Sequence, residues 1–183
     1  KAEFHYYLCK AYYQIDQNVF SLTHAQIAHD TFKAHDTYKE KTINCEMMLG
    51  ANKLDLLLHE QAQKHYENAQ AIAKANGFRY TESLALFNLG ICFERRKMFI
   101  ESSNCFKLAL SIPEHLESFV SVRSTYMLSK VLFQLGASDV ARSWYEKALK
   151  RATDEGEQEY LAKLKLVYAL YMEQDDQEVR KNI

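Results

Sequence analysis

The sequence predicts an all-α protein built from a stack of antiparallel helix pairs that repeat about every 40 residues. One observation that predicts this class is the scarcity of turn residues. Only five glycines and one proline occur among 183 residues. A sheet protein of this size needs many more such residues at its turns, so their scarcity favours long helices joined by short loops.

The second observation is an internal repeat. A small–aromatic–small pattern ends at Ala69, Ala109 and Ala148, and a weaker copy ends at Ala28, so the copies lie 41, 40 and 39 residues apart. A second pattern precedes each copy at the same spacing. Its anchor residues are Leu8, Leu49, Leu89, Leu128 and Val167. Two independent patterns that keep one spacing are hard to obtain by chance, so the chain is a repeat protein.

The residue types at these positions make physical sense. A small residue follows three of the anchors, as Gly50, Gly90 and Ser129, and lets the paired helix approach closely. An aromatic ring on the second helix, such as Tyr66, then fills the space, as close packing requires. This logic resembles the tetratricopeptide (TPR) motif, which implies a right-handed TPR-like superhelix. The period departs from the usual value of about 34 residues, so we expect longer helices.

The same patterns set the expected boundaries. Helix pairs are expected near residues 2–34, 38–75, 79–111 and 115–153, with a partial fifth pair at 157–183. The first helices are expected near 2–15, 38–57, 79–95, 115–135 and 157–173, and the second helices near 19–34, 60–75, 98–111 and 138–153. Gly77 and Gly136 are expected as left-handed helix caps, and Pro113 as a helix start. We expect one repeat domain over 1–183, and we interpret it as a fragment, because it begins without Met and stops within a pair.

Composition argues against several classes of function. The 23 Lys and Arg residues nearly balance 24 Asp and Glu residues, so the basic stripe that holds nucleic acid is missing. No apolar run reaches the roughly 18 residues of a membrane span. The four cysteines stand singly, which is typical of reduced core cysteines in a cytoplasmic protein and fits no zinc site. We find no catalytic constellation and expect no cofactor or metal.

Candidate binding residues lie on the first helices, which line the concave face of a TPR stack. Asn88 stands in an apolar run, where an unpaired buried amide costs about 1–3 kcal/mol. It should therefore either face the groove, where it can hold the backbone of an extended peptide, or be paired internally. Asp55 lies seven residues after Met48 on the same face, with Asn52 nearby. It suits a peptide amine or basic side chain, or else is a solvated charge at a helix end.

Other candidates are less specific. Basic residues of this face could grip a carboxylate or could be solvated, and its aromatic residues are more often packing than recognition. The complete set of candidate peptide-binding residues is Asn52, Asp55, Asn88, Met48, Phe87, Ile91, Arg95, Tyr126 and Lys130.

Several segments, in order along the chain, resemble the repeat region of Rap proteins, the response-regulator aspartate phosphatases of Gram-positive bacteria. The segments are Lys1-Ala-Glu-Phe-His-Tyr, Ala11-Tyr-Tyr-Gln-Ile-Asp-Gln, Ala51-Asn52 with Asp55, Asn88-Leu-Gly-Ile-Cys-Phe-Glu and Glu159-Tyr160 with Ala162-Lys163. The resemblance covers nearly the whole chain. It implies a protein in which an N-terminal three-helix bundle, absent from this sequence, engages response regulators and in some members promotes dephosphorylation of the regulator's aspartate.

The resemblance also implies that short secreted Phr peptides bind the repeat groove from the cytoplasm and inhibit the protein. Asp55 and Asn88 match the family's peptide contacts, with Asn52 close by. Ala162 departs from the acidic residue of some relatives, which affects peptide specificity. Two other readings stay open: a peptide-controlled transcriptional regulator with an upstream helix-turn-helix, and a scaffold TPR module that binds a folded protein.

Overall fold

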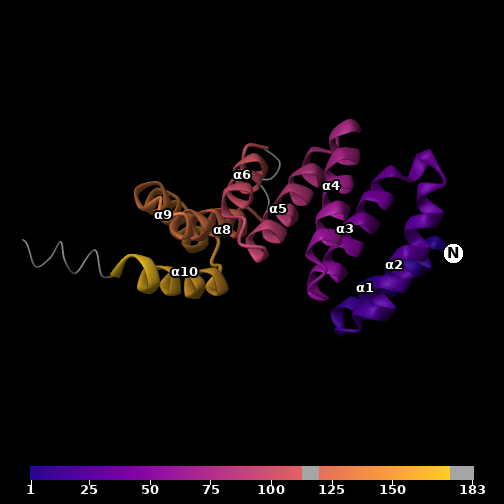
Figure 1. Ribbon diagram of the computed structural model, residues 1–183, viewed down its shortest axis with the longest axis horizontal. Helices are drawn as coiled ribbons and strands as arrows, with labels where there is room; N and C mark the ends of the chain where they lie inside the picture. Colours follow the sequence, from indigo (N-terminus) through magenta and orange to yellow (C-terminus); the bar gives the residue numbers. More distant parts are fainter. Residues whose placement is uncertain (113–119, 174–183) are drawn as a thin grey trace, which may run out of the picture. The chain divides into compact units, whose positions relative to one another are not determined.

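The computed structural model describes residues 1–112 and 120–173 (Figure 1). Over these residues the secondary structure consists of nine α-helices and one short 3-10 helix, with no β-strand. The helices are α1 (Ala2–Gln14), α2 (Asn18–Lys33), η1 (Asp36–Tyr38), α3 (Lys39–Asp55), α4 (His59–Ala75), α5 (Arg79–Arg95), α6 (Phe99–Leu110), α8 (Val120–Gln134), α9 (Ser138–Asp154) and α10 (Gln158–Tyr171).

The all-α, TPR-like fold predicted from the repeat is confirmed. Every helix end that falls in the described ranges lies within two residues of its expected position. The expected helix start at Pro113 and the end of the fifth pair lie outside the described residues. The 3-10 turn η1 was not predicted, because three residues are too few to show a helical period.

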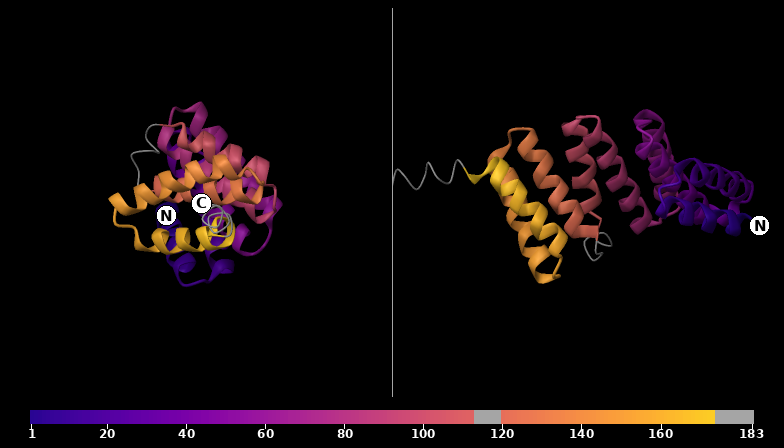
Figure 2. Two further views of the ribbon diagram at one scale, coloured as in Figure 1. Left: turned by 90° about the vertical axis from the view of Figure 1, so that its left-hand side faces the viewer. Right: turned by 90° about the horizontal axis from the view of Figure 1, so that it is seen from below.

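The chain folds into two compact units, Lys1–Met98 and the part from Phe99 onward. In the first unit α1 packs on α2, α2 on α3, α3 on α4 and α4 on α5 (Figure 2). The first helices of the pairs also contact one another, α1 with α3 and α3 with α5. In the second unit α6 packs on α8, α8 on α9, and α10 on both α8 and α9. One continuous domain over 1–183 stays a prediction.

The repeat residues form the core within each unit. Ala28, Ala69, Ala109 and Ala148 have no exposed surface. A Cβ added to Gly50 would lie 2.7 Å from Cε1 of Tyr66, whose side chain is almost fully buried. The predicted fit of an aromatic ring against a small residue is therefore present between α3 and α4.

Several turns between successive helices contain a residue in the left-handed conformation. Gly77 and Gly136 adopt φ values of 71° and 74°, as expected for helix caps, and Gly156 does the same. Leu57 adopts φ 61° in the turn between α3 and α4, although it has a side chain. Since L-residues are strained in this region, Leu57 stores unfavourable energy that a glycine would not.

The four cysteines are free and buried, as predicted. Burial raises the pKa of the Cys45 thiol to about 12, so this side chain is an un-ionised core residue. None of the helices in the described ranges is long and apolar enough to cross a membrane.

Candidate functional site

The predicted binding surface of the first unit is formed by α3 and α5, and we call it the first-helix face. Its residues are spaced three, four or seven apart, so they share one side of each helix. Because α3 and α5 contact each other, the two sets of side chains form one surface. The set comprises Asn44, Met48 and Asp55 on α3 and Leu84, Asn88, Ile91 and Arg95 on α5.

Asn88 lies half-buried at the centre of α5. Its amide nitrogen lies 4.0 Å from the sulfur of Met47, and a thioether sulfur is only a weak acceptor. No stronger side-chain partner for this amide occurs among the described residues. The amide therefore retains hydrogen-bonding capacity for a ligand.

Asp55 is exposed at the C-terminal end of α3. A negative charge at this end opposes the helix dipole, so Asp55 does not stabilise its own helix. Arg95 occupies the equivalent exposed position at the end of α5, where a positive charge is favourable. Among the described residues, neither side chain forms an ion pair with the other, so two opposite charges mark one end of the first-helix face.

Asn52 lies beneath the first-helix face rather than on it. Its side chain is fully buried, and its amide nitrogen donates to the carbonyl oxygen of Met48 at 2.8 Å. The side-chain oxygen of Asn52 has no hydrogen-bond partner in the described structure. An unpaired buried oxygen costs about 1–3 kcal/mol, so the burial of Asn52 lowers the free energy of unfolding.

The remaining candidates differ in exposure. Phe87 is only 2% exposed, which corrects its place among surface candidates, because the ring belongs to the core. Ile91 is half-buried and stays on the first-helix face. Tyr126 and Lys130 lie on α8, in the other unit, where both are half-buried and Tyr126 makes an edge contact with Tyr160 at 5.8 Å between ring centroids.

The first unit contains cavities that are lined by residues outside the candidate set. One of about 410 Å³ is bounded by the ends of α2 and α4, by η1 and by the start of α3. Its lining includes Lys33, Lys39 and Ile72, and none of the nine candidate residues.

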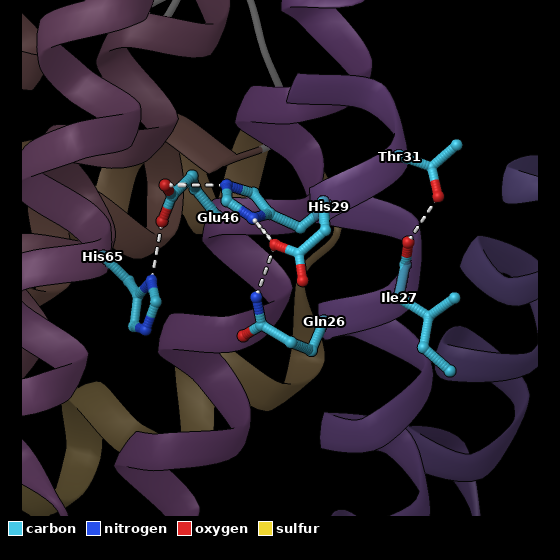
Figure 3. Close-up of polar contacts among 7 residues, drawn as sticks. Gln26, Ile27, His29, Thr31, Glu46 and His65 are labelled. Carbon is cyan, nitrogen blue, oxygen red and sulfur yellow. Dashed lines mark hydrogen bonds and ion pairs between the residues drawn. The ribbon is translucent and has the colours of Figure 1, made fainter. Parts of the chain in front are cut away.

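Sequence reasoning missed a buried polar cluster between α2, α3 and α4. Glu46 of α3 contacts His29 of α2 and His65 of α4 (Figure 3). The signal in the sequence was an acidic residue inside the apolar pattern of a first helix, since a buried charge must be paired. Within the described ranges, no group of three or more His, Cys, Asp and Glu side chains is placed to hold a metal ion.

The fold and the first-helix face define a TPR-type helical-repeat protein, a class that binds other chains through its helices. A family model described as tetratricopeptide repeat matches residues 122–155, which span α8 and α9. This match confirms the class in the second unit.

The resemblance to Rap proteins is also confirmed, since this chain is similar over nearly its full length to several Rap proteins of Bacillus subtilis. Regulatory protein RapF of Bacillus subtilis is 27% identical over 179 residues, which are 97% of this chain and 47% of that protein. Response regulator aspartate phosphatase I of the same organism is 26% identical over 182 residues, which are 100% of this chain and 46% of that protein. The chain therefore spans about half the length of these curated relatives.

Solved structures agree. The crystal structure of the apo form of RapI matches with a TM-score of 0.92 at 25% identity, over 99% of this chain and 66% of that one. The Rap conjugation gene regulator of plasmid pLS20, solved in complex with the Phr* peptide, matches with a TM-score of 0.84 at 29% identity, over 98% of this chain and 49% of that one.

Proposed function

We propose that this chain is the peptide-binding regulatory repeat domain of a Rap-type quorum-sensing protein that acts in the cytoplasm. Its ligand is a short linear peptide that lies along the first-helix face and inhibits the protein. The observation that carries the proposal is the Asn88 amide, which is half-buried in an apolar helix with only a weak sulfur contact. A Rap relative solved with a Phr* peptide supports it.

Each side chain of the face has a chemical role in this proposal. An asparagine amide can donate to a peptide carbonyl oxygen and accept from a peptide N–H, so Asn88 fixes the direction of the ligand backbone. Asp55 receives the peptide's amine or a basic side chain. Arg95, at the same level of the next first helix, receives a carboxylate. Met48 and Ile91 supply apolar contact between these polar groups.

The further candidates have narrower roles. Asn52 is buried in the described structure, and its amide nitrogen donates to the carbonyl oxygen of Met48. Its unpaired side-chain oxygen can therefore reach a peptide only if the turn of α3 around Met48 moves when the peptide binds. Tyr126 and Lys130 would contact peptide through α8. Binding of a response regulator, and any hydrolysis of its aspartyl phosphate, are proposed for the whole protein on the strength of relatives named response regulator aspartate phosphatases. We assign no catalytic residue to these repeats.

Calorimetric titration of synthetic pentapeptides into the purified protein tests the proposal. Replacing Asn88 by Ala removes two hydrogen bonds of roughly 0.5–1.5 kcal/mol each, so affinity should fall about 5- to 150-fold. Asn68→Ala is the matched control, because Asn68 is an exposed asparagine on the second helix α4. It should leave affinity unchanged.

A thermal melt of each variant separates binding from folding. If Asn88→Ala lowers the melting temperature while the folded fraction binds peptide as tightly as before, Asn88 is a structural residue. That result would favour a scaffold TPR module that binds a folded protein. Asp55→Asn should weaken only those peptides that carry an amine or basic residue at the matching end. That loss should shrink as salt rises, because the charges are exposed.

A further inference from the structure

A buried carboxylate joins three helices of the first unit. Glu46 on α3 is only 3% exposed. Its Oε1 lies 3.0 Å from Nε2 of His29 on α2, and its Oε2 lies 2.6 Å from Nδ1 of His65 on α4. Figure 3 shows both imidazoles directed at the one carboxylate, each at a different oxygen. We call Glu46, His29, His65 and Asp30 the Glu46 cluster.

His29 faces a carboxylate with each of its ring nitrogens. Its Nδ1 lies 3.1 Å from Oδ1 of Asp30, while its Nε2 faces Glu46. The same Asp30 oxygen accepts a hydrogen bond from Gln26 at 2.8 Å. A neutral imidazole carries one N–H and one lone pair, so it can donate to only one carboxylate and must turn a lone pair toward the other. The imidazolium donates to both, and so the geometry requires a charged His29.

His65 differs from His29 in this respect. Only its Nδ1 contacts a carboxylate, so a neutral ring with its proton on Nδ1 makes the same hydrogen bond as a charged one. His29 is therefore the member of the cluster whose contacts depend on a proton.

The charges that surround His29 favour the charged ring on balance. The hydrogen bond to Glu46 raises the pKa of His29, burial lowers it, and Asp30 raises it further. Lys33, one turn along α2, opposes the charge. From α3 the facing group is Glu46 itself, and His65 of α4 contacts the other oxygen of that carboxylate.

We propose that the Glu46 cluster is a proton-dependent clasp, in which a protonated His29 holds α2 against α3 and α4. When His29 loses its proton, Asp30, which is largely exposed, can turn to water. Glu46 cannot, and it is left as a buried carboxylate without a charged partner, which is costly. The first helix pair is then held less tightly to the second. This inference does not depend on peptide binding.

The sign of the effect follows from the direction of the pKa change. A group whose pKa is raised on folding contributes stability that is complete below its ordinary pKa, near 6.5, and is lost as the pH rises through the folded value. For each unit that folding adds to the pKa, the unfolding equilibrium constant rises about tenfold across that window. The clasp is therefore strongest at mildly acidic pH and weaker at alkaline pH.

Two measurements on the purified protein test the clasp. The first is the NMR titration of the His29 imidazole, in which we expect a midpoint above 6.5. The second is urea denaturation at a series of pH values, in which we expect the unfolding constant to rise at least about threefold between pH 6 and pH 8.5. Glu46→Gln should bring the midpoint down and flatten the pH dependence of the variant. Subtraction of the two curves cancels the histidines outside the Glu46 cluster.

Two further variants keep the test decisive if Glu46→Gln does not fold. Asp30→Asn alters an exposed side chain and should lower the His29 midpoint by a smaller amount. His35→Gln is the matched control, because His35 is an exposed histidine just after α2 and lies outside the cluster. This variant should leave the His29 midpoint and the pH dependence of stability unchanged. A His29 midpoint at or below 6.5 in the wild-type protein would overturn the proposal. So would a pH dependence of stability that is unchanged in both carboxylate variants.

Discussion

Gly50→Ala is the substitution that most sharply tests the packing of the repeat. Gly50 is buried in the middle of α3, where a new Cβ would lie 2.7, 2.9 and 3.0 Å from three ring atoms of Tyr66. Those distances are shorter than normal carbon contacts. Tyr66 is only 2% exposed, so its ring is surrounded by other atoms, and protein cores are packed closely.

Two opposing terms set the expected size of the effect. Ala is a better helix former than Gly by about 0.8–1 kcal/mol, so an open site would give a more stable protein. Overpacking a well-packed core costs typically about 1–3 kcal/mol. The sum predicts a loss of between about 0 and 2 kcal/mol in the free energy of unfolding, where an unpacked glycine would give a gain.

Urea denaturation followed by far-ultraviolet circular dichroism measures this change. The double variant Gly50→Ala with Tyr66→Leu supplies the control, because Leu lacks the ring atoms that the Cβ meets. The two changes should couple by at least about 1 kcal/mol. A Gly50→Ala protein that is about 1 kcal/mol more stable than wild type, with no coupling to Tyr66, would refute the packing argument.

Two further predictions concern stability. Leu57→Gly should raise the unfolding free energy by about 0.5–1 kcal/mol, because Leu57 adopts φ 61° and is 74% exposed. Leu56→Gly is the control and should give no gain, because Leu56 has an ordinary φ of −79°. Equal effects of the two variants in urea denaturation would contradict this prediction. In acid, burial opposes ionisation of Glu46, but the hydrogen bonds from His29 and His65 outweigh it and lower the carboxyl pKa from 4.5 to about 2. The resulting stability, on the order of 2–3 kcal/mol, should be present above pH 4.5 and be lost as the pH falls toward 2; acid titration of Glu46→Gln should lack this limb.

The helices were predictable because the repeat supplies its own alignment. A small residue and an aromatic ring recur at one spacing, and the buried alanines of the second helices fix the register of each pair. The 3-10 turn at Asp36–Tyr38 was not predictable in this way, since it has no counterpart in the described α4–α5 and α9–α10 connections.

The site was predictable only in part. Spacing predicts Asp55 and Asn88 on one face, and the two residues lie on the contacting helices α3 and α5. Spacing could not show that Phe87 turns into the core. It also could not show which charges meet. His29 and His65 come together at Glu46 only through the packing of three helices, and no single helical period contains that information.

The most direct test of the proposed function is a methyl NMR titration of the methionines with a bound pentapeptide. The protein has five methionines, of which Met47 and Met48 lie on α3 beside Asn88, and Met98 lies in the turn after α5. We predict that the Met47 and Met48 methyl signals shift to saturation with the peptide while the Met98 signal stays in place. Saturable binding that shifts Met98 and leaves Met47 and Met48 unchanged would place the ligand away from the first-helix face and contradict the account.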